Sequence, residues 1–232
     1  MRRQPLIQEL KEFRLRKGCY KMIGIIDYGM GNLFSVSNAL ARLSVPYFIS
    51  EKAEELMNAD GLILPGVGSF KDAMERLNVT GLSSMIKEFV QRGKPFLGIC
   101  LGMQLLFEGS KENGETVGLG LLPGYVEKFP GVAADGKLYK VPHMGWNQLE
   151  WVQYSPILQQ VEEDYVYFVH SYYVDQIDKE VLLAKCLYDV EVPAIVGSGN
   201  LYGMQFHPEK SSRLGMELLC NFTELARERV TK

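Results

Sequence analysis

The sequence predicts an α/β protein in which helices cover both faces of a mostly parallel sheet. Two observations support this prediction. Over roughly the first hundred residues, short apolar runs alternate with segments whose apolar residues recur at helical spacing. The apolar runs are also bounded by residues that break regular structure, mainly Gly, Pro, Asn and Asp. Strands that alternate with helices in this way form parallel sheets that are buried on both faces.

The first half of the chain contains four predicted strands. Asn32 is placed to cap the helix that follows the first strand, because its side-chain oxygen can accept from a free backbone N–H. The fourth strand runs directly into Cys100, and a helix is expected to follow it. The expected strands cover residues 23–27, 45–49, 61–64 and 96–99, and the expected helices cover residues 33–43, 69–77 and 82–91.

The pattern changes after about Gly109. Further strands are expected there without long helices between them, which indicates a mostly antiparallel extension of the same domain. A last strand and a closing helix then return to the first pattern. These strands are expected at residues 124–129, 139–141, 165–169, 181–187, 192–197 and 201–206, and the helix at residues 212–229. Residues 22–232 are expected to form one domain.

Composition excludes several classes of protein. The formal net charge of −3 does not suggest a nucleic-acid partner, and no apolar run is long enough to cross a bilayer. The four cysteines lie far apart, so we expect neither a disulfide framework nor a zinc site. We therefore expect the protein to work in a reducing cytoplasm. Residues 1–21 are basic and lack the apolar core of a signal peptide. We expect a poorly ordered leader, and the alternative is a small basic docking helix.

Cys100 is the strongest candidate for a reactive residue. Gly98 and Gly102 flank it in the pattern of a strand-to-helix elbow that presents a nucleophile. The two glycines are expected to allow the sharp turn. A thiol at a helix N-terminus lies at the positive end of the helix dipole, which favours the thiolate.

Active sites of parallel sheets lie at the carboxyl ends of the strands. Asp27, Cys100 and residues 65–68 (Pro-Gly-Val-Gly, here called the glycine loop) each follow a predicted strand, so we expect them to converge. The glycine loop and the Leu101 amide could donate N–H groups to an oxyanion. The alternative for the loop is an ordinary β-to-α turn.

A cysteine nucleophile needs a base, and the base needs an orienting acceptor. Of the three histidines, His207 precedes Pro208, which favours extended backbone, and Glu209 then points to the same side as His207. Glu209 could therefore hold one ring nitrogen while the other faces Cys100. The alternative is a surface histidine beside a solvated glutamate.

These residues resemble the class I (triad-type) glutamine amidotransferases, and other motifs resemble the glutaminase subunits of imidazole glycerol phosphate synthases. The resemblance runs from Met22 to near the end of the chain, and residues 1–21 have no place in it. The motifs that carry it are Gly98-Ile-Cys-Leu-Gly-Met-Gln104, His207-Pro-Glu209, Ile26-Asp-Tyr-Gly-Met-Gly-Asn32, Leu64-Pro-Gly-Val-Gly-Ser-Phe70, Pro142-His-Met-Gly-Trp-Asn147, Val169-His-Ser-Tyr172 and Gln205-Phe-His-Pro-Glu-Lys-Ser211.

The resemblance implies a flavodoxin-like fold and a reaction without cofactor or metal. Cys100 would attack the side-chain amide of glutamine, and a thioester would then be hydrolysed to glutamate with His207 as base. The resemblance implies that ammonia would pass to a separate cyclase subunit, a (β/α)8 barrel, in a heterodimer. That subunit would convert the ribulosyl intermediate PRFAR to imidazole glycerol phosphate and AICAR for histidine biosynthesis.

The resemblance also implies roles for individual residues, in addition to the triad of Cys100, His207 and Glu209. The oxyanion hole would comprise Val67, Gly68 and Leu101, and glutamine would be held by Gly66, Gln104, Ser171 and Tyr172. The cyclase-facing side would include Asn32, Pro142, Met144, Trp146, Asn147 and Lys210. The glycine loop would have to reorient before it could donate, so the isolated chain is expected to hydrolyse glutamine poorly.

Several alternatives stay open at this point. Gln104 could face solvent, Ser171 and Tyr172 could serve only sheet packing, and Trp146 could be a core aromatic. His143 and His170 are expected to be structural or interfacial, and Cys186 and Cys220 to be buried apolar residues. The whole chain could be another class I amidotransferase subunit, a γ-glutamyl hydrolase, a cysteine peptidase, or a binding scaffold with a decayed site.

Overall fold

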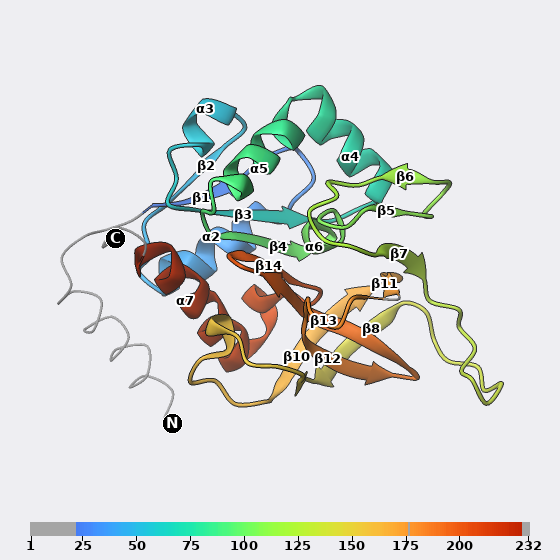
Figure 1. The fold of residues 1–232 in the computed structure, drawn as a ribbon. Coiled ribbons are helices and arrows are strands. Elements are labelled where there is room, and N and C mark those ends of the chain that lie inside the picture. The colour runs from blue at the N-terminus through green and yellow to red at the C-terminus, as the bar shows by residue number, and fades with distance from the viewer. Residues whose placement is uncertain (1–21, 176, 229–232) are drawn as a thin grey trace.

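The computed structural model describes residues 22–175 and 177–228, so the predictions for residues 1–21 lie outside it. Its centre is an eight-stranded sheet with the order β2-β1-β3-β4-β14-β13-β12-β9 (Figure 1). The first five strands are parallel and the last three antiparallel. In that order, the strands are Tyr47–Ser50, Ile23–Ile26, Gly61–Gly66, Phe96–Cys100, Leu201–Met204, Val190–Ser198, Leu182–Tyr188 and Glu150–Trp151. The predicted α/β class and parallel core are confirmed.

Helices cover both faces of this sheet (Figure 1). Alternate residues of a strand point to opposite faces, so Ile25 packs with α2 and α7, whereas Ile26 packs with α3, α4 and α5. These helices are α2 (Leu33–Arg42), α3 (Ala53–Leu56), α4 (Phe70–Val79), α5 (Leu82–Gln91) and α7 (Ser212–Glu228). The continuous apolar character of the predicted parallel strands therefore reflects burial on two sides.

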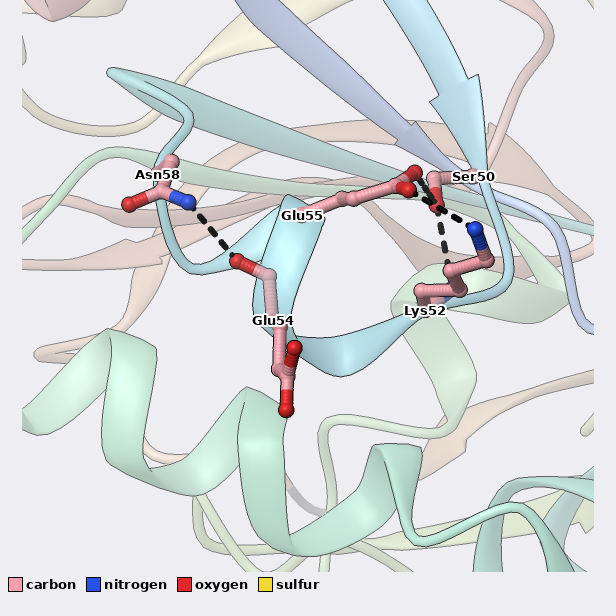
Figure 2. A network of polar contacts seen from close by, with 5 residues as sticks. All are labelled: Ser50, Lys52, Glu54, Glu55 and Asn58. Atoms are coloured by element: carbon pink, nitrogen blue, oxygen red, sulfur yellow. Dashed lines mark hydrogen bonds and ion pairs between the residues drawn. The ribbon is translucent and has the colours of Figure 1, made fainter.

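Side-chain caps fix where the helices start. Asn32 accepts from the Ser35 N–H at 3.3 Å, as predicted, and Ser69 accepts from the Asp72 N–H at 3.2 Å. A third network surrounds the short helix α3 (Figure 2). There the Ser50 hydroxyl accepts from the Lys52 N–H at 3.0 Å and donates to Glu55 at 2.6 Å. One helical turn is too short for helical periodicity to reveal, so α3 was not predicted from the sequence.

The second half of the chain adds two smaller sheets. The order in one is β11-β7-β5-β6, and β8 pairs with β10 in the other. The ranges are β5 (Gly109–Ser110), β6 (Thr116–Val117), β7 (Tyr125–Lys128), β8 (His143–Gln148), β10 (Tyr165–His170) and β11 (Tyr172–Asp175). The 3-10 helices are η1 (Pro156–Leu158) and η2 (Pro208–Lys210), and α6 (Leu101–Gln104) follows β4. The predicted antiparallel extension is confirmed.

One predicted strand is wrong. Residues 139–141 form no strand, and the Val141–Pro142 peptide bond that follows them is cis. Tyr139 and Val141 nevertheless pack against the core, so their apolar signal reflects a loop with partly buried side chains. Strand β8 was not expected because Met144 and Trp146 are apolar but exposed, which obscures the alternation typical of a half-buried strand.

The helices and two of the cysteines agree with what the composition predicted. Within the described ranges, none of the helices has the length and apolar character that a bilayer crossing requires. Cys186 and Cys220 are buried among apolar side chains, as predicted for cysteines that act as small hydrophobic residues.

Candidate active site

Cys100 stands at the junction of β4 and α6, at the carboxyl end of a central strand. Its backbone has φ 56° and ψ −112°, and only 7% of the residue is exposed. A non-glycine residue in such a conformation is strained by about 1–3 kcal/mol. The surrounding packing holds this strain and fixes the thiol at the end of the sheet, which is the position expected of an elbow nucleophile.

The glycines that flank Cys100 serve a different purpose from the one predicted. The positive φ of the turn belongs to Cys100 itself. A Cβ on Gly102 would lie 1.9 Å from the Leu64 carbonyl oxygen, and one on Gly98 would lie 2.4 Å from the Gly102 oxygen. Both positions require glycine because α6 packs directly against the backbone of β3 and β4.

His207 and Glu209 complete the cluster around the thiol. Glu209 Oε1 lies 2.8 Å from His207 Nδ1, and the imidazole is also hydrogen-bonded to Cys100. The side chains of His207 and Glu209 are 4% and 1% exposed. Strand β10 fixes the histidine, because the His207 N–H donates to the Tyr167 carbonyl at 3.1 Å. The predicted triad residues are therefore assembled, and the alternative of a surface histidine is wrong.

The electrostatics of the cluster favour a charged imidazole. Burial lowers the pKa of His207, but its interactions with Cys100 and then Glu209 outweigh burial and raise the pKa to about 9. The protonated ring therefore contributes to stability below its unfolded pKa near 6.5, and this contribution is lost as the pH rises through about 9. An imidazolium beside a thiolate is the arrangement that activates cysteine nucleophiles.

The glycine loop is turned away from the thiol. The Val67 N–H donates to the Met30 carbonyl at 3.0 Å, so it is not available to an oxyanion. Leu101 is the first residue of α6, where a backbone N–H has no partner within the helix. Of the predicted oxyanion donors, Leu101 is therefore suitably placed and Val67 is not.

The pocket beside Cys100 has most of the predicted catalytic and substrate-binding residues on its wall. Its lining comprises Val67, Gly68, Cys100, Leu101, Gln104, Glu112, Pro142, Val169, His170, Ser171, Tyr172, His207 and Lys210. Gly66 is absent from this wall, because it is buried beneath the elbow, where a Cβ would lie 2.8 Å from the Gly102 nitrogen. Asp27 is also absent, and its carboxylate accepts from the Gly29 N–H within its own turn.

Gln104 is buried and lines the pocket, which excludes the solvent-facing alternative. Its side-chain nitrogen donates to the Tyr172 carbonyl at 2.9 Å and to Gln205 Oε1 at 3.0 Å. Gln104 therefore ties α6 to the backbone that follows β10, on the opposite wall of the pocket.

His170 on the pocket wall and His143 behind it form a buried pair, in keeping with the structural role expected for them. The Tyr172 carbonyl can only accept, so His170 Nδ1 donates to it at 2.8 Å, and His170 Nε2 accepts from His143 Nδ1 at 3.0 Å. Burial lowers the pKa of His170 to about 3 and that of His143 to about 4. Both rings are therefore neutral at physiological pH, which preserves this direction of donation.

Sequence reasoning did not find Glu112. Its carboxylate lines the pocket and accepts from the Phe70 N–H, the first of α4, at 2.7 Å. A carboxylate there could receive the ammonium group of an amino acid. The only regular element between Gln104 and Glu112 is the two-residue strand β5, so helical or strand spacing offers no signal for Glu112.

The residues predicted for the cyclase-facing side differ in exposure. Pro142 and Lys210 are exposed on the pocket rim, and Met144 and Trp146 are 60% and 51% exposed on β8. The core-aromatic alternative for Trp146 is therefore wrong.

The other two residues predicted for that side hold local structure. Asn147 donates to the Leu187 carbonyl at 2.9 Å, and Asn32 caps α2. Helix α2 contacts η2, which carries Lys210. These two side chains are engaged within the chain itself, unlike the exposed side chains of Met144 and Trp146.

Comparison with known families identifies the group to which this geometry belongs. The sequence model described as glutamine amidotransferase class-I matches residues 24–225. The chain belongs to the class I glutamine amidotransferase family. Among solved members of this fold, a glutamine amidotransferase crystal structure superposes with a TM-score of 0.69 at 24% identity, covering 88% of this chain and 98% of that one. The flavodoxin-like architecture predicted from the sequence is confirmed.

Curated relatives identify the branch of the family. The chain is 64% identical over 204 residues to the imidazole glycerol phosphate synthase subunit HisH of Geobacillus sp. (strain WCH70), covering 88% of this chain and 97% of the relative. It is 56% identical over 211 residues to the subunit of the same name from Bacillus subtilis (strain 168), covering 91% of this chain and all of the relative. Such identity over nearly the full length of these relatives assigns the chain to the HisH group of amidotransferases.

Proposed function

We propose that this chain is the glutaminase subunit of a cytoplasmic imidazole glycerol phosphate synthase. It hydrolyses glutamine and delivers the ammonia to a cyclase subunit, which uses it to convert PRFAR to imidazole glycerol phosphate and AICAR. The observation that carries the proposal is the buried Cys100–His207–Glu209 cluster in a chain 64% identical to a HisH subunit.

Glutamine would lie in the pocket with its side-chain amide against Cys100. The carboxylate of Glu112 would receive its ammonium group, and the backbone of Ser171 and Tyr172 would border the substrate on the opposite wall. Because Gln104 and His170 both donate to the Tyr172 carbonyl, that backbone is held in place before the substrate arrives. A preformed wall reduces the entropy lost on binding.

The reaction begins when the Cys100 thiolate attacks the amide carbon. The Leu101 N–H stabilises the oxyanion, and the imidazolium of His207 gives its proton to the departing nitrogen. The C–N bond breaks, ammonia leaves, and a γ-glutamyl thioester remains on Cys100. His207 then takes a proton from water, which attacks the thioester. Glutamate leaves, and the thiolate–imidazolium pair is restored, so one glutamine and one water give glutamate and ammonia.

The resting chain has an incomplete oxyanion hole, because the Val67 N–H is paired with Met30. Loss of one such donor costs about 10²–10³-fold in turnover. We propose that the cyclase and its bound substrate favour a reoriented glycine loop, so that ammonia is released only when it can be used. Glycine at positions 66 and 68 makes the reorientation of the intervening peptides inexpensive.

The exposed apolar side chains of Met144 and Trp146 next to the pocket rim form the proposed cyclase contact, together with Pro142 and Lys210. Aromatic anchors of this kind carry much of the binding energy in protein interfaces. The contact lies on the same side as the pocket, so ammonia would have a short protected path to the partner.

An isotope competition tests the proposal. The chain and its cyclase subunit are supplied with PRFAR, glutamine carrying ¹⁵N in its side-chain amide, and unlabelled ammonium at equal concentration. We expect nearly all imidazole glycerol phosphate to carry ¹⁵N. Product labelled in proportion to the ammonium pool would refute channelling, and a lack of glutamine-dependent product would refute the function.

A further inference from the structure

Tyr28 presents a buried polar atom that the reaction does not use. It lies two residues after the end of β1, is 5% exposed, and packs among the apolar side chains beneath α4 and α5. Its hydroxyl has no hydrogen-bond partner among the described residues. A buried hydroxyl without a hydrogen-bond partner destabilises the fold, so its presence calls for an explanation.

The hydroxyl lies directly beneath the catalytic elbow. A Cβ built on Gly66 would be 2.8 Å from Tyr28 Oη, 2.8 Å from the Gly102 nitrogen and 2.9 Å from the Leu101 Cβ. Burial, and secondarily the negative charge of Cys100, raises the pKa of Tyr28 well above its usual range. The group is therefore a neutral donor at all physiological pH values, and it stands at the base of the glycine loop.

The resting loop explains why this donor is unused. The peptide between Gly66 and Val67 directs its N–H to the Met30 carbonyl, in the turn that follows Tyr28. In a trans peptide the N–H and C=O point in opposite directions, so the Gly66 carbonyl points away from that turn. Reversal of the peptide would exchange the two groups and turn the Gly66 carbonyl toward the turn that carries Met30. The Tyr28 hydroxyl stands next to Gly66, 2.8 Å from the place of a Cβ there, so it is within reach of a carbonyl that turns.

A reversed peptide would need a donor on that side. The Met30 carbonyl cannot supply one, whereas the Tyr28 hydroxyl can. We propose that Tyr28 is a positioning residue for the active loop: its hydroxyl donates to the Gly66 carbonyl once the peptide has turned the Val67 N–H toward the pocket. In the resting state the Val67 N–H is bonded to Met30 and the Tyr28 hydroxyl has no partner among the described residues. In the active state the hydroxyl would bond to the Gly66 carbonyl and the Val67 N–H would be free for the oxyanion. This inference rests on the proposed function, because it assigns a role in completing that oxyanion hole.

Another role for the hydroxyl would be direct donation to the Cys100 sulfur. The two roles differ in what the substitution Tyr28→Phe would change. Loss of a bond to the sulfur would alter the thiolate in the resting chain, and hence the pH dependence of its alkylation. Loss of a bond to Gly66 would leave that pH dependence as it is and lower turnover, because fewer molecules would hold the loop in its active form.

The test compares wild type, Tyr28→Phe and Tyr139→Phe, each with the cyclase subunit and PRFAR. Tyr139 is the matched control, because its hydroxyl is also buried without a partner among the described residues but packs against Phe129 and Tyr188, away from the elbow. Glutaminase kcat and KM, the pH dependence of Cys100 alkylation by iodoacetamide, and Tm are measured for all three. Wild-type glutaminase in this assay reports separately on the proposed function.

For Tyr28→Phe we expect kcat to fall about 3- to 10-fold, the effect of one neutral hydrogen bond, with KM unchanged. The alkylation profile should match that of wild type, and Tm should not fall. Tyr139→Phe should keep the wild-type kcat. A wild-type kcat in Tyr28→Phe, a shifted alkylation profile, or an equal loss in Tyr139→Phe would each overturn the role assigned to Tyr28.

Discussion

The triad and the glycine loop face the same pocket but stand in different states. Cys100, His207 and Glu209 are in contact and buried, and the raised pKa of His207 favours its charged form. The Val67 N–H, by contrast, is bonded to Met30. The difference teaches that closely packed side chains assemble the chemistry of this site without a partner, whereas one donor that we propose for the oxyanion hole, a backbone N–H, is held elsewhere.

Packing explains why the two regions can differ. The elbow leaves no room for a side chain at Gly98 or Gly102, so the nucleophile cannot move without disrupting the sheet. The glycine loop has exposed residues, Val67 and Gly68, and a positive φ of 102° at Gly68. A partner could therefore change the loop without touching the triad, and the following experiments separate the two regions.

The largest effect should come from the nucleophile. Cys100→Ala should lower glutamine-dependent turnover by on the order of 10⁶-fold, since no other group can form the thioester. Ammonia-dependent synthesis by the complex should be spared. Cys186→Ala, which removes a buried thiol elsewhere, should leave the ratio of the two rates at the wild-type value. Retention of glutamine-dependent synthesis in Cys100→Ala would contradict the assignment.

A smaller loss should follow from Glu209→Gln. The amide can still accept from His207 but carries no charge, so kcat should fall about 10²- to 10⁴-fold. Wild-type activity should decline as the pH rises through about 9, where the imidazolium loses its proton. Because Glu209 helps to raise that pKa, the decline should begin at lower pH in the variant. Identical pH profiles would count against Glu209 as the orienting group.

The pocket wall should affect binding more than chemistry. Glu112→Gln keeps an acceptor for the Phe70 N–H and removes the charge proposed to receive the substrate ammonium. The KM for glutamine should rise about 10- to 150-fold with kcat little changed, the effect of losing a charged hydrogen bond. Glu115→Gln, an exposed neighbour outside this pocket, is the control. An unchanged KM in Glu112→Gln would place the ammonium elsewhere.

Changes in β8, the proposed cyclase-facing strand, should weaken binding of the cyclase and leave the triad intact. Trp146→Ala should raise the Kd for the cyclase about 30-fold or more, as expected for an aromatic anchor worth at least about 2 kcal/mol. At saturating cyclase, turnover should approach the wild-type value. Val79→Ala, an exposed apolar residue at the end of α4, should bind normally. Binding is measured by titration calorimetry, and a wild-type Kd for Trp146→Ala would show that β8 is not part of the cyclase interface.

The sequence predicted the parallel half of the fold well because local patterns there coincide with tertiary structure. The strand that ends at Cys100 and the cap at Asn32 follow from residues adjacent in the chain. His207 and Glu209 could be paired because they belong to one short extended segment. Resemblance then supplied Ser171 and Tyr172, whose own spacing identifies no role.

The remaining features depend on contacts between distant segments. Glu112 reaches the pocket because it caps α4, which is 42 residues earlier in the chain. The need for glycine at position 102 comes from the Leu64 carbonyl. Tyr139 and Val141 suggested a strand because they are apolar, although these partly buried side chains belong to a loop. None of these relations leaves a periodic signal in the sequence.

We propose above all that the assembled triad stays inactive until the glycine loop turns. The most direct measurement is the glutaminase kcat of the purified chain alone, with the cyclase subunit, and with the cyclase subunit plus PRFAR. We predict a rise of about 10²–10³-fold in total, the value of one oxyanion donor, with no change in the rate of Cys100 alkylation. Full turnover by the chain alone would contradict the account.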